Sequence, residues 1–116
     1  MIDTEDLAFQ RIEMIQTENP GAITKHDTEE YEDTEWVVIT IADENGSASS
    51  IEIIESDTSW KRDDAITHYN ELAEDLDLAV ILPDEAFEEV AAQLARDGLP
   101  NIALLSYSDL GLIPRS

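Results

Sequence analysis

A β-hairpin can be recognised directly in residues 36–56. Residues 36–42 are rich in β-branched and aromatic side chains, and a second extended run covers about residues 48–55. The runs are separated by Asp43-Glu44-Asn45-Gly46. Asn-Gly is a strong turn signal, because both residues tolerate the positive φ angles that tight hairpins require. The sequence therefore predicts two antiparallel strands at the centre of the fold.

The second strand of this hairpin should have two different faces. Side chains alternate along a strand, so the even-numbered residues, including Glu52 and Ile54, should lie on one face. The odd-numbered residues, including Ile53 and Glu55, should lie on the other. Ile54 at an even-numbered position indicates that the face carrying Glu52 is packed with apolar side chains.

The remaining elements follow from hydrophobic periodicity and from helix start and stop signals. We expect helices over residues 3–18, 59–76 and 84–97, a short strand over 22–26, and buried strands over 78–82 and 101–107. Residues 27–35 are polar and acidic, and we expect a solvated loop or an edge excursion there. The predicted order is α-β-β-β-α-β-α-β in a single domain. Two buried strands separated by a helix imply a parallel pair, so the fold class is α/β, with a mixed sheet flanked by helices.

The charge balance is extreme. The chain has 28 Asp and Glu residues against 6 Lys and Arg, a formal net charge of −22, yet 42% of its residues are hydrophobic. Disorder is the competing interpretation, but the apolar residues form periodic blocks that can build a core. The composition is typical of haloarchaeal proteins adapted to molar salt, which screens such self-repulsion over ~3 Å. We expect a cytoplasmic protein with no membrane span, and the absence of cysteine excludes disulfides and thiolate sites.

The predicted order, with Ile-Glu-Ile-Ile-Glu-Ser on the second hairpin strand, resembles the restriction-endonuclease-like family, the PD-(D/E)XK nucleases. The resemblance covers roughly residues 3–105. It implies a site in which two carboxylates hold Mg²⁺ at the scissile phosphate while a lysine polarises the attacking water. The family's acid-x-lysine motif falls on Glu52, but Ile54 stands where the lysine should be.

The resemblance implies further site residues. The family aspartate would fall near Trp36, where the nearest acids are Asp33 and Glu35, and Glu35 should point to the opposite face from Trp36. Glu13 could take the place of the glutamate that the family's N-terminal helix supplies. Some members carry the lysine on the following helix, which makes Lys61 its substitute here. The plainer interpretation is that Lys61 and the adjacent Arg62 form exposed ion pairs with nearby aspartates: Asp57, Asp63 or Asp64.

Three functions remain open from the sequence. The leading hypothesis is an inactive nuclease-like fold without a cofactor, serving as a structural or interaction module through a protein partner or a homodimer. The alternative is a Mg²⁺-dependent nuclease that uses Glu52, Glu35 and Lys61. The third is a non-nuclease α/β regulatory module, in which a helix would cover Glu52 and Ile54. Six basic residues give little support to nucleic-acid binding. A strand beginning at Trp36 would be an unprotected edge that invites dimers, whereas the acidic residues around it argue against pairing.

Overall fold

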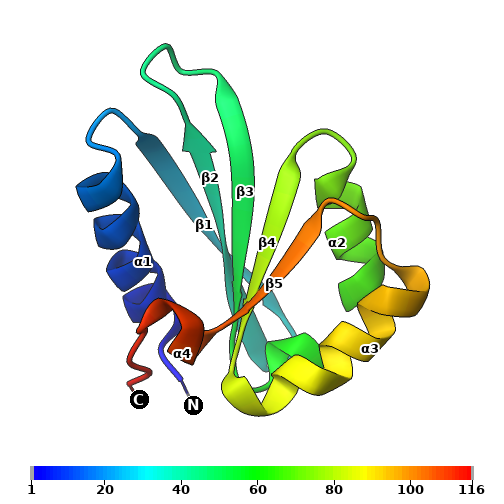
Figure 1. Cartoon of the computed structure of the whole chain (residues 1–116). Helices are drawn as coiled ribbons and strands as arrows, with labels where there is room; N and C mark the ends of the chain where they lie inside the picture. The colour runs from blue at the N-terminus through cyan, green and yellow to red at the C-terminus, as the bar shows by residue number, and fades with distance from the viewer. Residues whose placement is uncertain (1, 116) are drawn as a thin grey trace.

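A twisted sheet with helices against both of its faces organises the chain (Figure 1). The computed structural model of the protein describes residues 2–115. Within these residues the sheet has five strands. The elements in chain order are α1 (Thr4–Glu18), β1 (Ile23–Tyr31), β2 (Thr34–Ala42), β3 (Ala48–Glu55), the 3₁₀ turn η1 (Ser59–Lys61), α2 (Ala65–Ala73), β4 (Asp77–Leu82), the 3₁₀ turn η2 (Asp84–Ala86), α3 (Phe87–Asp97), β5 (Ile102–Ser106) and α4 (Tyr107–Leu110).

The strands lie side by side in the order of the sequence, β1-β2-β3-β4-β5. β1, β2 and β3 pair antiparallel, whereas β3, β4 and β5 pair parallel. The predicted α/β class and mixed sheet are therefore confirmed. The predicted hairpin is also confirmed: the β2–β3 turn contains Gly46 at a φ of 83°, and the Asp43 carboxylate accepts hydrogen bonds from the backbone of Asn45 and Ser47.

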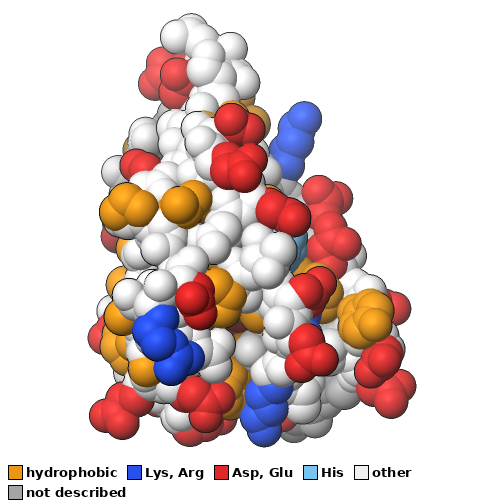
Figure 2. All heavy atoms as spheres, turned by 90° about the vertical axis from the view of Figure 1, so that its right-hand side faces the viewer, with side chains coloured by type: hydrophobic (Ala, Val, Ile, Leu, Met, Phe, Trp, Pro, Cys, Tyr) orange, Lys and Arg blue, Asp and Glu red, His pale blue; other side chains and the backbone are white. Residues whose placement is uncertain are grey.

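The two faces of the sheet carry separate hydrophobic cores. On one face, α1 and α4 cover a cluster that includes Val37, Ile39 and Ile54. On the other, α2 and α3 cover a cluster that includes Trp36 and Ile53. This division confirms the predicted alternation along the second hairpin strand. Seen from the α2–α3 side, carboxylates are spread over the surface and outnumber the basic groups (Figure 2). No helix within residues 2–115 is both long and apolar enough to cross a membrane.

Of the two expectations for residues 27–35, the solvated loop is wrong, because most of this stretch belongs to strands, and residues 27–31 lie on the edge strand. β1 continues to Tyr31, and β2 begins at Thr34, so only a tight turn separates them. Glu32 in this turn has a φ of 57°. Acidic residues have low strand propensity, but β1 pairs with β2 along its whole length, and that pairing overrides the local preference. The predicted edge at Trp36 is also wrong, because β2 lies between β1 and β3.

The expected continuous helix over residues 59–76 is also wrong at its start. The chain makes the short turn η1 and then an extended residue, Arg62, with φ −64° and ψ 145°, before α2 begins at Ala65. This break lets the Arg62 side chain turn inward toward the end of β3. Another short helix, α4, follows β5, where Ser106 and Asp109 form a capping box.

Candidate functional site

Glu52, the acid that would bind a metal under the nuclease alternative, is held by an arginine from α1. The Arg11 guanidinium donates from Nε to Oε1 at 2.7 Å and from Nη2 to Oε2 at 2.9 Å. Both carboxylate oxygens are therefore engaged by one planar, bidentate partner. The side chains of Arg11 and Glu52 are only 13% and 9% exposed, respectively. The hydrogen bond to Glu52 raises the pKa of Arg11 against the opposing effect of burial.

The surroundings of this ion pair are apolar. Ile54, two residues further along β3, is fully buried beneath α1 in the core that contains Leu7 and Ile39. A lysine at position 54 would place an ammonium group inside that core. The α1 face of β3 therefore presents a neutralised carboxylate and packed side chains.

The structure does not bring the other expected site residues to Glu52. Glu52 lies opposite Ile39 of β2, whereas Glu35 is four residues away along that strand, roughly 13 Å at ~3.3 Å per residue. There, Glu35 accepts a hydrogen bond from the hydroxyl of Thr4 at 3.3 Å. Glu13 is exposed on the outer side of α1.

Lys61 lies against the opposite side of the sheet. Its Nζ sits 5.4 Å from the centre of the Trp60 ring, and Trp60 packs on the core beneath α2 and α3. Glu52 faces α1, so the sheet separates the two side chains. Within the part of the chain that the structure describes, no group of three or more acidic or imidazole side chains is placed to hold a metal ion.

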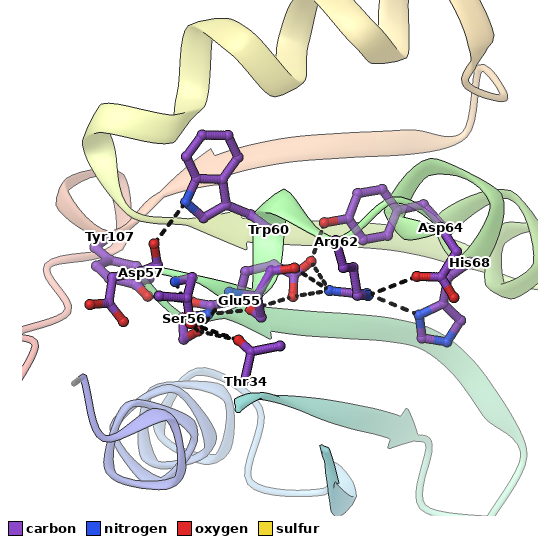
Figure 3. Close-up of polar contacts among 12 residues, drawn as sticks. Thr34, Glu55, Ser56, Asp57, Trp60, Arg62, Asp64, His68 and Tyr107 are labelled. Carbon is purple, nitrogen blue, oxygen red and sulfur yellow. Dashed lines mark hydrogen bonds and ion pairs between the residues drawn. The ribbon is translucent and has the colours of Figure 1, made fainter. Parts of the chain in front are cut away.

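A second carboxylate, Glu55, lies at the centre of a buried polar cluster (Figure 3). Glu55 ends β3 and is 0% exposed. Arg62 donates from Nη1 to both carboxylate oxygens, at 2.7 and 2.8 Å. The Ser59 hydroxyl donates to Oε1 at 2.8 Å, and the Tyr69 hydroxyl donates to Oε2. Three side chains from the η1–α2 region thus converge on one buried anion.

Arg62 is held by more than its ion pair. Its guanidinium stacks 3.8 Å from the centre of the Trp36 ring, and its Nη2 lies 3.2 Å from Nδ1 of His68. Nη1 also donates to the Ser59 carbonyl at 2.8 Å. The side chain is 5% exposed. An aromatic face, a carboxylate and a backbone carbonyl therefore fix both the position and the charge of this guanidinium.

Two buried tyrosines close the cluster. Burial, followed by the Glu55 carboxylate, raises the pKa of Tyr69 well above its ordinary value of 10.0. Tyr107, from the start of α4, donates to the Glu55 backbone carbonyl, and burial raises its pKa as well. Both phenols therefore remain neutral donors. The Glu55 carboxylate and the Tyr69 and Tyr107 hydroxyls are thus all hydrogen-bonded within the cluster, whereas the buried Nε of Arg62 has no hydrogen-bond partner among residues 2–115.

This cluster was not predicted from the sequence. Arg62 was expected to pair with exposed aspartates, and its Nε does lie 3.7 Å from Asp64, but its main partner is Glu55. One signal was available: Glu55 falls in phase with Ile51 and Ile53, on the apolar face of β3. An acid in phase with a buried face requires a partner.

A hollow of about 740 Å³ lies beside the cluster, between the β1–β2 turn and the residues around η1. Its lining includes four carboxylates, from Glu32, Asp33, Asp63 and Asp64, together with the side chain of Lys61. Arg62 forms part of its inner wall, but its charge is already neutralised by Glu55. The hollow thus has an acidic rim, with the Lys61 ammonium among its carboxylates.

Comparisons with known proteins give no family for this chain. No protein-family model, no curated protein and no solved structure matches it.

Proposed function

We propose that this chain is a catalytically inactive, restriction-endonuclease-like module that acts by binding another protein chain. Support for the fold family comes from the order of the strands: a hairpin, then two parallel strands, with α1 against the face that carries Glu52. In the nucleases that the sequence resembles, a metal-binding acid occupies this face of the second hairpin strand.

The observation that carries the proposal is the ion pair between Arg11 and Glu52. A divalent cation and a guanidinium compete for the same two carboxylate oxygens, and both oxygens lie within 2.9 Å of Arg11 nitrogens. Metal binding would require the guanidinium to leave a largely buried site and give up two charge-assisted hydrogen bonds. Arg11 thus takes the electrostatic role of the metal, and the position becomes a structural contact between α1 and β3.

The acidic surface supports a protein that works in concentrated salt, and we propose a haloarchaeal, cytoplasmic setting on that basis. With a net charge of −22, nucleic acid is a poor partner at any ionic strength, because phosphate binding draws on Lys and Arg. Binding to a protein surface or to a sheet edge does not depend on Lys and Arg in this way.

The experiment is a cleavage assay with Mg²⁺ or Mn²⁺ on supercoiled plasmid and on short duplex and single-stranded DNA, in about 1 M KCl, where charges are screened beyond ~3 Å. Wild type, Glu52→Ala and Lys61→Ala are compared. We expect no cleavage above the no-protein control from any of the three. Metal-dependent cleavage by wild type that Glu52→Ala abolishes would overturn the proposal in favour of a nuclease that uses a displaced lysine.

One observation favours a second candidate, an α/β regulatory module unrelated to nucleases. α1 covers both Glu52, 7% exposed, and Ile54, 0% exposed. A chain that never had a metal site would bury this face in the same way. The two candidates agree on the absence of catalysis, and they differ only in the origin of the fold.

A further inference from the structure

β1 is an edge strand whose outer backbone groups have no partner strand among residues 2–115. It is nine residues long, and its register with β2 is continuous from Ile23 to Tyr31. Its other side has no neighbour in the sheet. Proteins commonly protect such edges with proline, a bulge or a very short strand. β1 has none of these and carries only charged side chains as a deterrent.

Exposed apolar side chains mark both ends of this edge. Within residues 2–115, five large hydrophobic residues are exposed, and three of them lie on β1 or beside it: Ile23 at 44%, Tyr31 at 61% and Phe9 at 51%. Ile23 and Tyr31 mark the two ends of β1 and share one face, because they are eight residues apart. Phe9 projects from α1 and packs edge-on against His26 of β1, on the opposite face of the sheet from Ile23 and Tyr31. Apolar surface that borders an open strand is typical of an interface.

Symmetry limits how two copies of β1 can pair. In an antiparallel pair related by a two-fold axis, facing residues lie on the same side of the sheet, so their numbers must have the same parity. The register that uses all of β1 places the axis at Asp27. Ile23 then faces Tyr31 of the second copy, and Lys25 faces its Glu29, each pair occurring twice.

This register is self-complementary along one face. At both ends of the paired strands an apolar side chain faces an aromatic one, and next to each of these pairs a basic side chain faces an acidic one. Both kinds of cross-strand pair are stabilising. The single conflict is Asp27, which meets its own copy on the axis. A shift by one step of the same parity would place Lys25 opposite Asp27, leave Ile23 against Glu29 and leave Tyr31 outside the paired strands.

We propose that β1 binds β1 of a second copy of this chain, antiparallel and centred on Asp27, to form a continuous ten-stranded sheet. The inference rests on the proposed role as a binding module and names its partner. Two chains of net charge −22 repel each other. The Debye length falls from ~10 Å at 0.1 M salt to ~3 Å at 1 M, so the repulsion weakens and dimerisation strengthens as the salt concentration rises.

A charge-swap series tests both the dimer and its register. Dissociation constants are measured by analytical ultracentrifugation at about 0.3 M and about 1 M KCl for wild type, Lys25→Glu and Glu29→Lys. Each single variant creates two repulsive pairs, and at the lower salt we expect about tenfold weaker self-association, which corresponds to about 1.4 kcal/mol. Both positions are exposed, so the variants should fold, and circular dichroism verifies this.

Mixing the two single variants restores both opposite-charge pairs, and we expect a heterodimer at least as tight as the wild-type homodimer, visible by native mass spectrometry. Asp27→Asn provides the matched control of register. It removes the like-charge contact on the axis and should tighten the dimer several-fold. In the shifted register, the same change would remove the partner of Lys25 and weaken the dimer.

Three results would overturn the inference. The first is a protein that stays monomeric in about 1 M KCl at concentrations up to about 1 mM, because the Kd of any self-association would then lie above about 1 mM. The second is a dimer that neither single charge swap affects. The third is weakening by Asp27→Asn, which would reject this register. None of these results bears on the absence of cleavage, so failure of the dimer and failure of the proposed function are separable.

Discussion

Removing the charge of Arg62 should be among the most damaging single changes in this chain. We choose Arg62→Met, because methionine keeps an unbranched apolar side chain next to Trp36 while it removes the guanidinium. Glu55 is 0% exposed and would keep only the Ser59 and Tyr69 hydroxyls as side-chain donors. A buried ion that loses its partner typically destabilises a protein by about 3–5 kcal/mol.

We expect Arg62→Met to lower the free energy of unfolding by about 3 kcal/mol, the lower end of that range, because both remaining hydroxyls can still donate to the carboxylate. The loss includes the stacking of the guanidinium on Trp36, which alone contributes ~1–2 kcal/mol when desolvated. A domain of this size has a total stability of roughly 6–17 kcal/mol. The variant should therefore fold, with a much lower unfolding midpoint.

The assay is urea unfolding at constant KCl, followed by circular dichroism, because guanidinium would itself change the ionic strength. Glu55→Gln and the double variant complete a thermodynamic cycle. Once Arg62 is gone, neutralising Glu55 should be less harmful than in wild type, with a coupling energy of about 1–3 kcal/mol. A loss below about 1 kcal/mol for Arg62→Met, or additive effects in the cycle, would refute the view that this ion pair supports the fold.

Three further outcomes follow from the same contacts. Arg11→Met should lower the unfolding free energy by about 2 kcal/mol in the same urea assay, and Glu52→Gln by less, because the amide oxygen of glutamine can still accept a hydrogen bond from Arg11; a loss below about 0.5 kcal/mol for Arg11→Met would contradict the ion-pair account. Tyr69 and Tyr107 have pKa values raised above 10.0, so above this pH the folded state holds protons that the unfolded chain releases. The free energy of unfolding is therefore unaffected below about pH 10. Above that pH it falls by about 1.4 kcal/mol per pH unit for each tyrosine. Urea titrations between about pH 9 and 11 should show this fall, with a shallower slope in Tyr69→Phe; an unchanged slope would contradict it. Thermal unfolding followed by circular dichroism should show the midpoint rising between about 0.1 and 2 M KCl, because the Debye length shrinks from ~10 Å toward ~2–3 Å; a midpoint independent of salt would argue against self-repulsion.

The parts of the fold that the sequence predicted depend on short-range signals. The Asn45-Gly46 turn, the alternation along β3 and the apolar periodicity of the helices each act over a few residues. These signals were enough for the order of the elements and the division of the sheet into two faces. The predicted strand over residues 22–26 is shorter than β1, because the acidic second half of β1 is extended only through its pairing with β2. Local sequence preferences do not encode that pairing.

The two buried ion pairs illustrate what sequence reasoning lacked. Arg11 and Glu52 are 41 residues apart and meet only after α1 has packed on the sheet. Arg62 and Glu55 are seven residues apart, but the intervening turn hides their relation, because a continuous helix would have pointed Arg62 elsewhere. Metal binding by Glu52 and Glu35 remains a prediction of the family resemblance, and the structure places these two carboxylates at different positions along β2 and β3.

The most direct test of the central claim is a Mg²⁺ and Mn²⁺ titration of the folded protein in about 1 M KCl, where nonspecific attraction is screened. Amide shifts are followed by NMR in wild type and in Arg11→Met. The account predicts weak, non-saturating shifts spread over the acidic surface of wild type, with any response at Glu52 appearing only after Arg11 is removed. A saturable site in wild type at sub-millimolar metal, with shifts concentrated at Glu52, Glu35 and Glu13, would contradict it.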